Sequence, residues 1–174
     1  TLEAYQSLFK RDDTVAHFKG DGIEYSTFEE KTIWVGDYVI VRVDNGGSIF
    51  DRIYHISTDR LALVGQNVVD RMDDTYSLQE LEAMDVIEVL FEGPIEAGAA
   101  PNGDEILTDM IIETPYKTFA NVIVTQRTET DGSVNETYYA PGYGIVATRF
   151  TSADGYQVQS LLQSIDEGET NSSL

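Results

Sequence analysis

The sequence predicts a mainly β protein, built as a curved antiparallel sheet in the form of an open or flattened barrel with one short helix. Three observations predict it. Short runs rich in Val, Ile, Thr, Tyr and Phe recur along most of the chain, as strands require. Turn sequences separate them, most clearly at residues 44–47 (Asp-Asn-Gly-Gly) and 130–133 (Thr-Asp-Gly-Ser). A helical signal is confined to one short stretch, which disfavours a parallel α/β fold.

Each predicted strand ends at a turn or loop rich in Gly, Pro, Asn or Asp. The long run at residues 23–35 is expected to be bent or bulged around residues 29–31, and residues 96–104 are expected to form a loop. The predicted strands are residues 15–18, 23–35, 38–43, 49–56, 61–64, 86–91, 106–113, 119–127, 134–139, 144–150 and 156–165.

The one predicted helix, residues 78–83, is marked by its N-terminal cap. Ser77 is followed three residues later by Glu80, which is the spacing of a capping box. In that motif the two side chains satisfy backbone N–H groups that the first helical turn leaves unpaired. Near the N-terminus, Tyr5 and Phe9 also have helical spacing, over a short span.

A Pro-Gly turn near the C-terminal end organises the rest of the chain. Pro141 lacks a backbone N–H, and Gly142 can adopt the positive φ that a tight turn needs. Gly144 has no side chain, as expected where another backbone or a bulky ring packs closely. The spacing Gly142-x-Gly144-x-x-Ala147 also matches the dinucleotide-binding fingerprint, but that motif must open a helix. A β-branched and aromatic run follows instead, so a structural turn is the favoured interpretation.

We expect one β domain over residues 1–165, followed by a disordered tail over residues 166–174, which is polar and has no periodicity. The spacing Gly-x-Gly-Ile-x-x-x-x-Phe occurs once near the front of the domain and once near its back. This repeat suggests two half-units, about residues 15–91 and 104–165. Chance similarity between Gly-rich turns is the alternative explanation.

Composition excludes several classes of function. The formal net charge is −20, from 31 acidic and 11 basic residues, and such a surface repels nucleic acid and anionic headgroups. Solubility is the favoured explanation of this charge, and binding of cations or of a basic partner is the alternative. The absence of cysteine excludes disulfides, thiol catalysis and thiolate metal sites. No run of about 18 apolar residues is present, so no membrane span is expected.

No catalytic residue, metal ligand or cofactor is predicted. His17 and His55 lie outside any H-E-x-x-H motif, and the chain contains no G-x-S-x-G motif. The acidic cluster at residues 70–74 lacks the spacing of a calcium-binding loop, so a solvated acidic surface is the favoured interpretation. Catalytic triads of other kinds are recognised by geometry and stay open at this point.

Aromatic residues are the remaining signal for a binding surface. On strands they mostly build the core and cross-strand contacts, but a Tyr-rich rim can also line a groove. Tyr138, Tyr139 and Tyr143 gather around the Pro-Gly turn. These three residues are therefore the predicted ligand-binding surface.

Several turn-and-strand motifs are shared with one group of domains. They are residues 18–25 (FKGDGIEY), 44–48 (DNGGS), 93–95 (GPI), 97–98 (AG), 114–115 (TP), 118–122 (TFANV) and 138–146 (YYAPGYGIV). Over most of residues 15–165 the chain resembles uncharacterised secreted or lipoprotein-type β domains of Gram-positive bacteria. The resemblance implies an extracytoplasmic domain without an established activity. It also implies secretion or lipid anchoring through a segment upstream of Thr1.

Two functional hypotheses follow. The first is a non-catalytic domain of the cell envelope that binds an apolar or lipid-like ligand or a partner protein. The second is an enzyme with a carboxylate-based site that the sequence does not reveal. A pocket lined by Tyr, Phe and Leu would favour the first hypothesis, and a cleft with converging Asp, Glu and His would favour the second.

Overall fold

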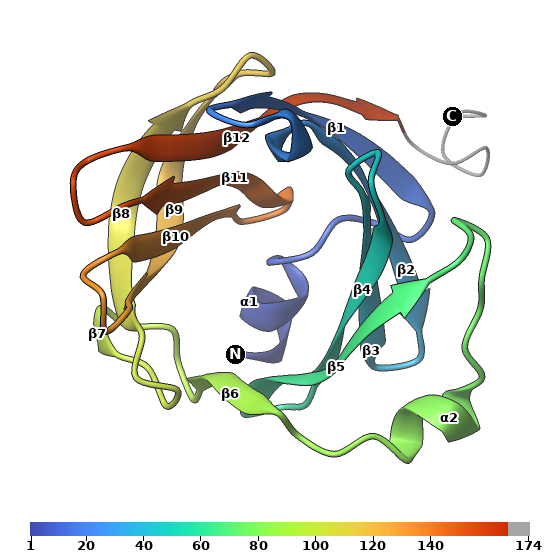
Figure 1. Ribbon diagram of the computed structural model, residues 1–174. Coiled ribbons are helices and arrows are strands. Elements are labelled where there is room, and N and C mark those ends of the chain that lie inside the picture. Colours follow the sequence, from blue (N-terminus) through green and yellow to red (C-terminus); the bar gives the residue numbers. More distant parts are fainter. Residues whose placement is uncertain (167–174) are drawn as a thin grey trace.

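Residues 1–166, the part of the chain that the computed structural model describes, contain a twelve-stranded antiparallel sheet that curls around on itself (Figure 1). The sheet is not closed into a barrel, because its two end strands, β6 and β7, do not pair. The predicted curved, open antiparallel sheet is thus confirmed. The strands are β1 (Thr14–Asp21), β2 (Phe28–Val35), β3 (Tyr38–Asp44), β4 (Ile49–Ile56), β5 (Arg60–Val69), β6 (Glu88–Glu92), β7 (Gly98–Ala99), β8 (Glu105–Glu113), β9 (Thr118–Thr128), β10 (Val134–Ala140), β11 (Gly144–Thr151) and β12 (Gln157–Asp166).

The strand order is β6-β5-β4-β3-β2-β1-β12-β11-β10-β9-β8-β7. Strands β1 to β6 therefore form one meander and β7 to β12 form a second. The two meanders meet where β1 pairs with β12, from Val15 opposite Asp166 to Asp21 opposite Gln159. Every other neighbouring pair is consecutive in sequence and can form locally, so the β1–β12 ladder is the one pairing that brings the two ends of the chain together.

The bend expected around residues 29–31 lies earlier in the chain. Residues 29–31 pair regularly with both β1 and β3. The break is instead a 3₁₀ helix, η1 (Glu24–Ser26). Its backbone packs against Gly20 so closely that a Cβ on Gly20 would lie 2.2 Å from the carbonyl carbon of Ser26. The hydroxyl of Ser160 on β12 donates to the Ser26 carbonyl at 2.6 Å, which fixes η1 against the sheet.

Several further boundaries differ from the predicted ones; β1, for example, continues to Asp21. β5 continues five residues beyond the predicted end, because residues 65–69 still pair with β4 through the backbone. The predicted loop at residues 96–104 contains the two-residue strand β7. Asp166, which was expected to begin the tail, ends β12, and its carboxylate lies 3.0 Å from His17 Nε2. The rest of the predicted tail, residues 167–174, lies outside the described residues.

The predicted helix is present as α2 (Leu78–Glu82), and its capping box is confirmed. The Glu80 N–H donates to Ser77 Oγ, and the Ser77 N–H donates to a Glu80 carboxylate oxygen, both at 3.1 Å. Leu81 is fully buried against the outer face of the sheet. Its cluster contains Tyr38, Ile40, Ile53, Val64 and Leu81.

A buried ion pair holds the segment between β5 and α2 to the same outer face. Arg42 donates from Nε and Nη2 to the two carboxylate oxygens of Asp51, at 2.7 and 2.8 Å, and both side chains are fully buried. Arg42 Nη1 also donates to the carbonyls of Met72 and Asp74. Tyr76 adds its hydroxyl to Asp51 at 2.7 Å. These bonds satisfy the pair, which burial without partners would make costly.

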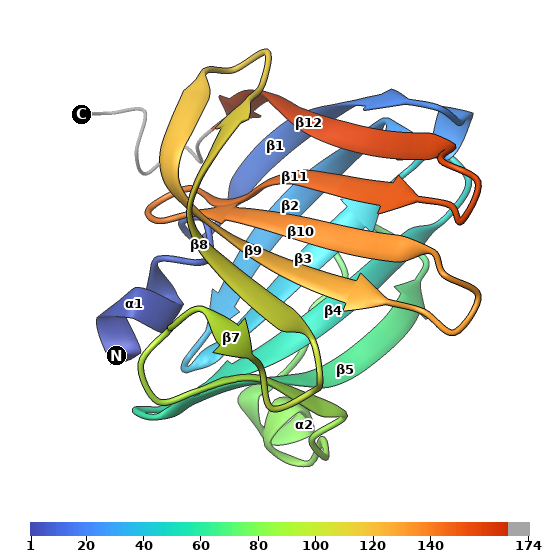
Figure 2. The same cartoon turned by 90° about the vertical axis from the view of Figure 1, so that its left-hand side faces the viewer.

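A second helix, α1 (Leu2–Gln6), lies at one end of the rolled sheet (Figure 2), and Tyr5 together with the following Leu8 and Phe9 packs into that end. Tyr5 and Leu8 are fully buried, and Phe9 is 7% exposed. The Tyr5 hydroxyl donates to the Gly93 carbonyl. The structure thus contains a second helix besides the one that the sequence predicts. The apolar pattern of α1 is too short to predict a helix by itself, and burial of its apolar residues in the rolled sheet stabilises it. The surrounding cluster contains Val39, Val41, Tyr54, Ile56, Leu61, Leu63, Phe91, Ala100, Ile106 and Tyr139.

Side chains, not a backbone ladder, link the two meanders where the sheet stays open. Arg127 on β9 donates from Nη2 to both carboxylate oxygens of Glu88 on β6, at 3.1 Å each. The Arg127 Nε donates to Asp104, just before β8, at 2.6 Å. These side-chain contacts join the two meanders, although β6 and β7 share no backbone ladder.

Candidate functional site

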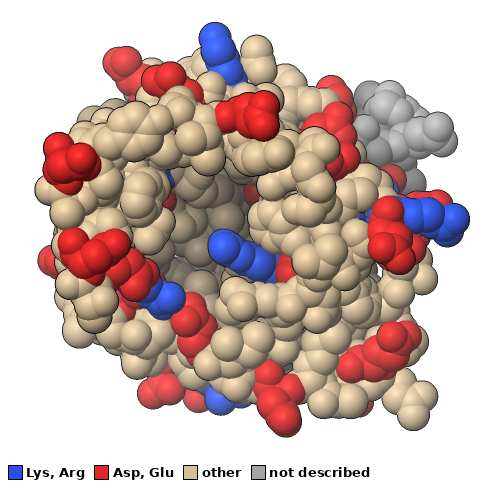
Figure 3. Space-filling view, in the orientation of Figure 1, with Lys and Arg blue, Asp and Glu red and all other residues tan. Residues whose placement is uncertain are grey.

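The rolled sheet encloses a lumen. Tyr5 of α1, with Leu8 and Phe9, packs into one end of it, and the face seen in Figure 3 is hollowed. Side chains alternate along a strand, so Val43 and Phe50 point to the same side as the core residues Val41 and Tyr54. Val68 lies directly opposite Phe50. Phe50 is only half-buried, and Val68 is 77% exposed. Apolar side chains therefore face the lumen and remain open to solvent at its hollow end.

A cavity of about 220 Å³ is lined by residues 50–52 of β4 and 66–68 of β5, the paired segments that carry Phe50 and Val68. Tyr25 of η1 reaches across to the turn between β3 and β4, where a Cβ on Gly47 would lie 2.7 Å from its ring. Most acidic side chains in this view lie around the outer surface, and a basic side chain lies at the rim of the hollow (Figure 3). We call this region the lumen mouth and define it by Val43, Phe50, Arg52, Gln66 and Val68.

Polar groups deeper in the lumen are paired or neutral. Burial raises the pKa of Tyr139, and it raises the pKa of Tyr54 against the opposing effect of Arg52. Both phenols therefore present neutral hydroxyls at neutral pH. Glu88 is neutralised by Arg127. The deeper part of the lumen therefore contains polar side chains. Its carboxylates, Glu88 and Asp104, are directed at Arg127.

The three predicted tyrosines occupy different environments. Tyr139 is buried in the cluster around α1, whereas Tyr138 is buried in a second cluster that includes Phe119. The Tyr138 hydroxyl accepts a hydrogen bond from Arg149 at 3.2 Å. Tyr143 is half-buried, and its ring centroid lies 5.0 Å from that of Phe119. Of the three, Tyr143 lines a cavity, and the binding role of all three stays a prediction.

That cavity forms at a place where β11 and β12 separate. Their ladder runs from Ala147 opposite Leu161 toward the β11–β12 turn. Before it, residues 144–146 of β11 pair only with β10, and residues 162–166 of β12 pair only with β1. We call the opening between these two segments the seam.

Two groups from other parts of the chain satisfy backbone carbonyls in the seam. Lys10, which follows α1, donates from Nζ to the Ile145 carbonyl at 2.6 Å and to Glu30 at 2.8 Å. The Tyr116 N–H donates to the Leu162 carbonyl at 3.1 Å. A buried ammonium and a backbone amide thus replace the missing strand-to-strand hydrogen bonds.

Tyr116 reaches the seam because the β8–β9 hairpin is bent. Asp109 and Asn121 adopt positive φ values of 57° and 56°, and the ladder shifts register beside them. Such bulges sharpen the twist of a hairpin. They direct the hairpin tip, with Tyr116 and Lys117, toward Tyr143, whose hydroxyl lies 3.3 Å from Lys117 Nζ.

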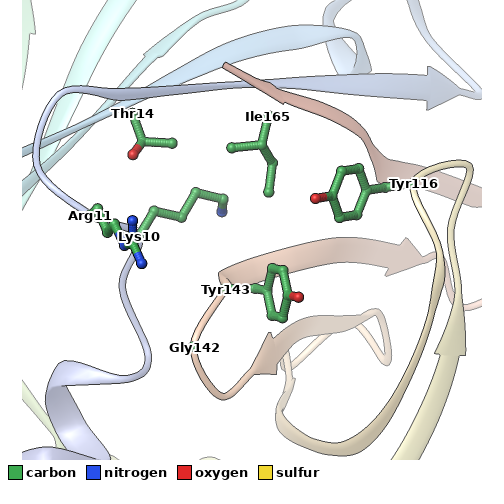
Figure 4. A pocket seen from close by; sticks show the side chains of 7 residues that line it. All are labelled: Lys10, Arg11, Thr14, Tyr116, Gly142, Tyr143 and Ile165. Atoms are coloured by element: carbon green, nitrogen blue, oxygen red, sulfur yellow. The ribbon is translucent and has the colours of Figure 1, made fainter. Parts of the chain in front are cut away.

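The resulting cavity, which we call the seam pocket, has a volume of about 350 Å³. The Lys10 ammonium and the Tyr116 hydroxyl both point into it (Figure 4). Thr14 is 2% exposed, and its hydroxyl oxygen has no hydrogen-bond partner. The residues that line the seam pocket are Lys10, Arg11, Thr14, Tyr116, Gly142, Tyr143 and Ile165. Sequence reasoning missed Lys10, Thr14 and Tyr116, because no local pattern marks them.

The Pro-Gly turn forms one wall of the seam pocket by docking onto the segment after α1. The Gly142 N–H donates to the Ser7 carbonyl at 2.8 Å. Gly142 and Gly144 have φ values of 88° and 70°, which confirms the predicted need for glycine in this turn. A Cβ on Gly144 would lie 3.0 Å from Lys10 N and 3.2 Å from Leu8 O, so the predicted close backbone approach is also confirmed.

No protein-family model and no curated protein sequence matches this chain. Two solved structures share its fold. One is a protein from Bacteroides fragilis described as exported and as having a YmcC-like fold, with 12% identity and a TM-score of 0.51, covering 91% of this chain and 97% of that one. The other is described as a lipoprotein from Parabacteroides distasonis, with 13% identity and a TM-score of 0.51, covering 90% and 96%.

The chain therefore has a fold that occurs in proteins described as exported. This agrees with the exported type of the resemblance seen in the sequence. Its Gram-positive origin is not supported, because both similar structures come from Gram-negative bacteria. Among residues 1–166, no helix has the length and apolar character that crossing a bilayer requires. No group of three or more His, Asp or Glu side chains in this part of the chain is placed to hold a metal ion.

Proposed function

We propose that this chain is a non-catalytic, extracytoplasmic domain of the cell envelope that binds a small apolar molecule in the lumen mouth. The observation that carries the proposal is the pair Phe50 and Val68, apolar side chains that face the lumen, the first half-buried and the second exposed. Tyr5 of α1, with Leu8 and Phe9, is packed into the other end of the lumen, so that end is closed. The exported character of the two proteins that share the fold supports the location.

The size of the expected interaction follows from the apolar surface that a ligand would cover. A micromolar dissociation constant corresponds to about −8 kcal/mol. At about 25 cal/mol per Å², this free energy requires roughly 320 Å² of apolar surface removed from water, before the costs of immobilising the ligand. A neutral apolar ligand suits the site, because the net charge of −20 gives no general attraction for anions.

The lumen favours binding over catalysis. A carboxylate that acts as a general acid or base must reach a substrate with its proton or lone pair available. Glu88 and Asp104 instead share the guanidinium of Arg127, at 3.1 and 2.6 Å. Glu30 is 3% exposed and is paired with Lys10. These pairings account for the acidic groups near the lumen without assigning them a reaction.

Titration of a neutral hydrophobic fluorophore into the protein tests the proposal. We expect saturable binding in the micromolar range, with heat-denatured protein as the blank. Val68→Asn should weaken binding at least fivefold, since it replaces an apolar wall of the lumen mouth. Ile111→Asn is the matched control, because Ile111 is 68% exposed on β8 and is not part of the lumen mouth.

Absence of a saturable signal at tens of micromolar would refute the apolar-ligand proposal. Equal weakening by Val68→Asn and Ile111→Asn would also refute it, because the probe would then be reporting exposed apolar surface in general. In either case a partner protein becomes the better candidate for the lumen mouth.

A further inference from the structure

We propose that the seam pocket binds a small organic carboxylate that carries an aromatic ring. The site is separate from the lumen mouth: its lining residues and those of the lumen mouth are different. Failure of one proposal therefore leaves the other standing. Four features of the seam pocket carry the inference, namely an unpartnered hydroxyl, a buried ammonium, a described lining with basic but no acidic residues, and aromatic walls.

The unpartnered hydroxyl belongs to Thr14. Buried polar groups in folded proteins almost always have a hydrogen-bond partner, and each exception calls for an explanation. Thr14 is 2% exposed, lines the seam pocket and has no partner for Oγ1. An oxygen of a bound carboxylate would accept a hydrogen bond from this hydroxyl. A ligand in the seam pocket would therefore supply the hydrogen-bond partner that the Thr14 hydroxyl lacks.

The buried ammonium belongs to Lys10. An ammonium group has three N–H donors. Two of them are used, by Glu30 at 2.8 Å and by the Ile145 carbonyl at 2.6 Å. The side chain points into the seam pocket, which leaves a donor for a ligand there (Figure 4). Because Glu30 and the carbonyl hold the ammonium in place, binding would require no reorganisation of Lys10.

The lining of the seam pocket contains basic residues although the protein as a whole is acidic. Only 11 of the 174 residues are Lys or Arg, yet Lys10 and Arg11 both line the seam pocket. Lys117 lies beside it, with Nζ 3.3 Å from the Tyr143 hydroxyl. Among the described lining residues none is Asp or Glu. Glu30 pairs with Lys10 from outside the lining, so the lining itself offers N–H donors of a cationic group and no carboxylate. Hydrogen bonds from such donors are strongest to an anion.

The walls and the volume set the size of the ligand. The rings of Tyr116 and Tyr143 meet edge to face with centroids 6.3 Å apart, and Ile165 adds an aliphatic surface. Aromatic walls of this kind favour a flat ring. The volume of about 350 Å³ is at the lower end of the range for small-molecule sites. Benzoate combines the expected charge, ring and size, and serves as the probe.

The test is a titration of the isotope-labelled protein, followed by amide chemical shifts in an NMR spectrum. Benzoate should give saturable shifts at residues around the seam pocket, and benzamide, which has the same shape without the charge, should not. Thr14→Val and Tyr116→Phe should each weaken benzoate binding at least fivefold. Thr125→Val and Tyr156→Phe are the matched controls, since Thr125 is buried on β9 and Tyr156 precedes β12, both outside the seam pocket.

Thr14→Val also separates binding from a structural role. Removing an unpartnered hydroxyl should leave the melting temperature unchanged or raise it, so any loss of benzoate binding cannot be attributed to unfolding. Equal affinity for benzoate and benzamide would overturn the proposal. So would unchanged benzoate binding in Thr14→Val and Tyr116→Phe, or shifts that do not saturate.

Discussion

Replacing Gly144 by alanine tests how closely the Pro-Gly turn packs against the segment after α1. The new Cβ would lie 3.0 Å from Lys10 N, 3.2 Å from Leu8 O and 3.2 Å from the carbonyl carbon of Phe9. All three are backbone atoms, which cannot move aside as a flexible side chain would. Gly142→Ala is the matched control, because Gly142 has a similar φ and a Cβ there would meet nothing within 4 Å.

The difference between the two variants isolates the effect of close packing. A non-glycine residue in the left-handed region costs about 1–2 kcal/mol, and both variants carry this cost. Overpacking against fixed neighbours costs about 1–3 kcal/mol more, and only Gly144→Ala carries it. We therefore expect a loss of about 1–2 kcal/mol for Gly142→Ala and about 2–5 kcal/mol for Gly144→Ala. The larger, β-branched Gly144→Val should lose at least as much as Gly144→Ala.

Urea denaturation followed by tryptophan fluorescence measures both effects. Trp34 is the single tryptophan of the chain, its indole N–H donates to the Lys10 carbonyl at 2.8 Å, and its ring contacts Phe9. It therefore reports on the segment that Gly144→Ala would displace. With a slope of about 2 kcal/mol per M, the midpoints of the two variants should differ by roughly 1 M.

The native emission of Trp34 gives a second, independent readout. It should shift in Gly144→Ala and stay unchanged in Gly142→Ala, because only the first substitution pushes against Lys10. Equal urea midpoints for the two variants would refute the reasoning, since positive φ alone would then explain both losses.

Two further predictions concern stability away from the lumen. Arg42→Leu should destabilise the fold by about 3–5 kcal/mol, because it leaves Asp51 buried without its cationic partner. A decrease of less than about 1 kcal/mol in the free energy of unfolding, measured by urea denaturation, would contradict the importance of that pair. Ser77→Ala should cost about 1 kcal/mol through loss of the capping box on α2, whereas Ser48→Ala, at an exposed serine in the β3–β4 turn, serves as its control. Thermal unfolding that ranks these two serine variants equally would show that the cap contributes nothing.

The local features of this fold could be predicted from the sequence because they depend on residues close together in the chain. Runs of β-branched and aromatic residues located every described strand except the two-residue β7, and turn residues located the hairpins between them. The capping box of Ser77 and Glu80 located α2 to within one residue of its end. Gly142 and Gly144 were predicted to need positive φ or a close neighbour, and both have it.

The candidate sites could not be predicted in the same way. Lys10, Thr14 and Tyr116 are separated by up to 106 residues in sequence, and each is unremarkable in its local context. They share a cavity because β11 and β12 separate and because two bulges bend the β8–β9 hairpin toward them. The tyrosines at the turn illustrate the same limit, since a strand directs Tyr138 and Tyr139 into different clusters even though they are adjacent.

The sequence by itself thus determined a β protein of consecutive hairpins, an acidic surface and the glycine turn. Only the tertiary structure decided that β1 pairs with β12, that α1 fills one end of the lumen and that Lys10 occupies the seam. The physical reason is the range of the interactions. Hairpins and caps form between residues a few positions apart, whereas curvature, helix burial and the seam depend on contacts that exist only after the two ends of the chain have met.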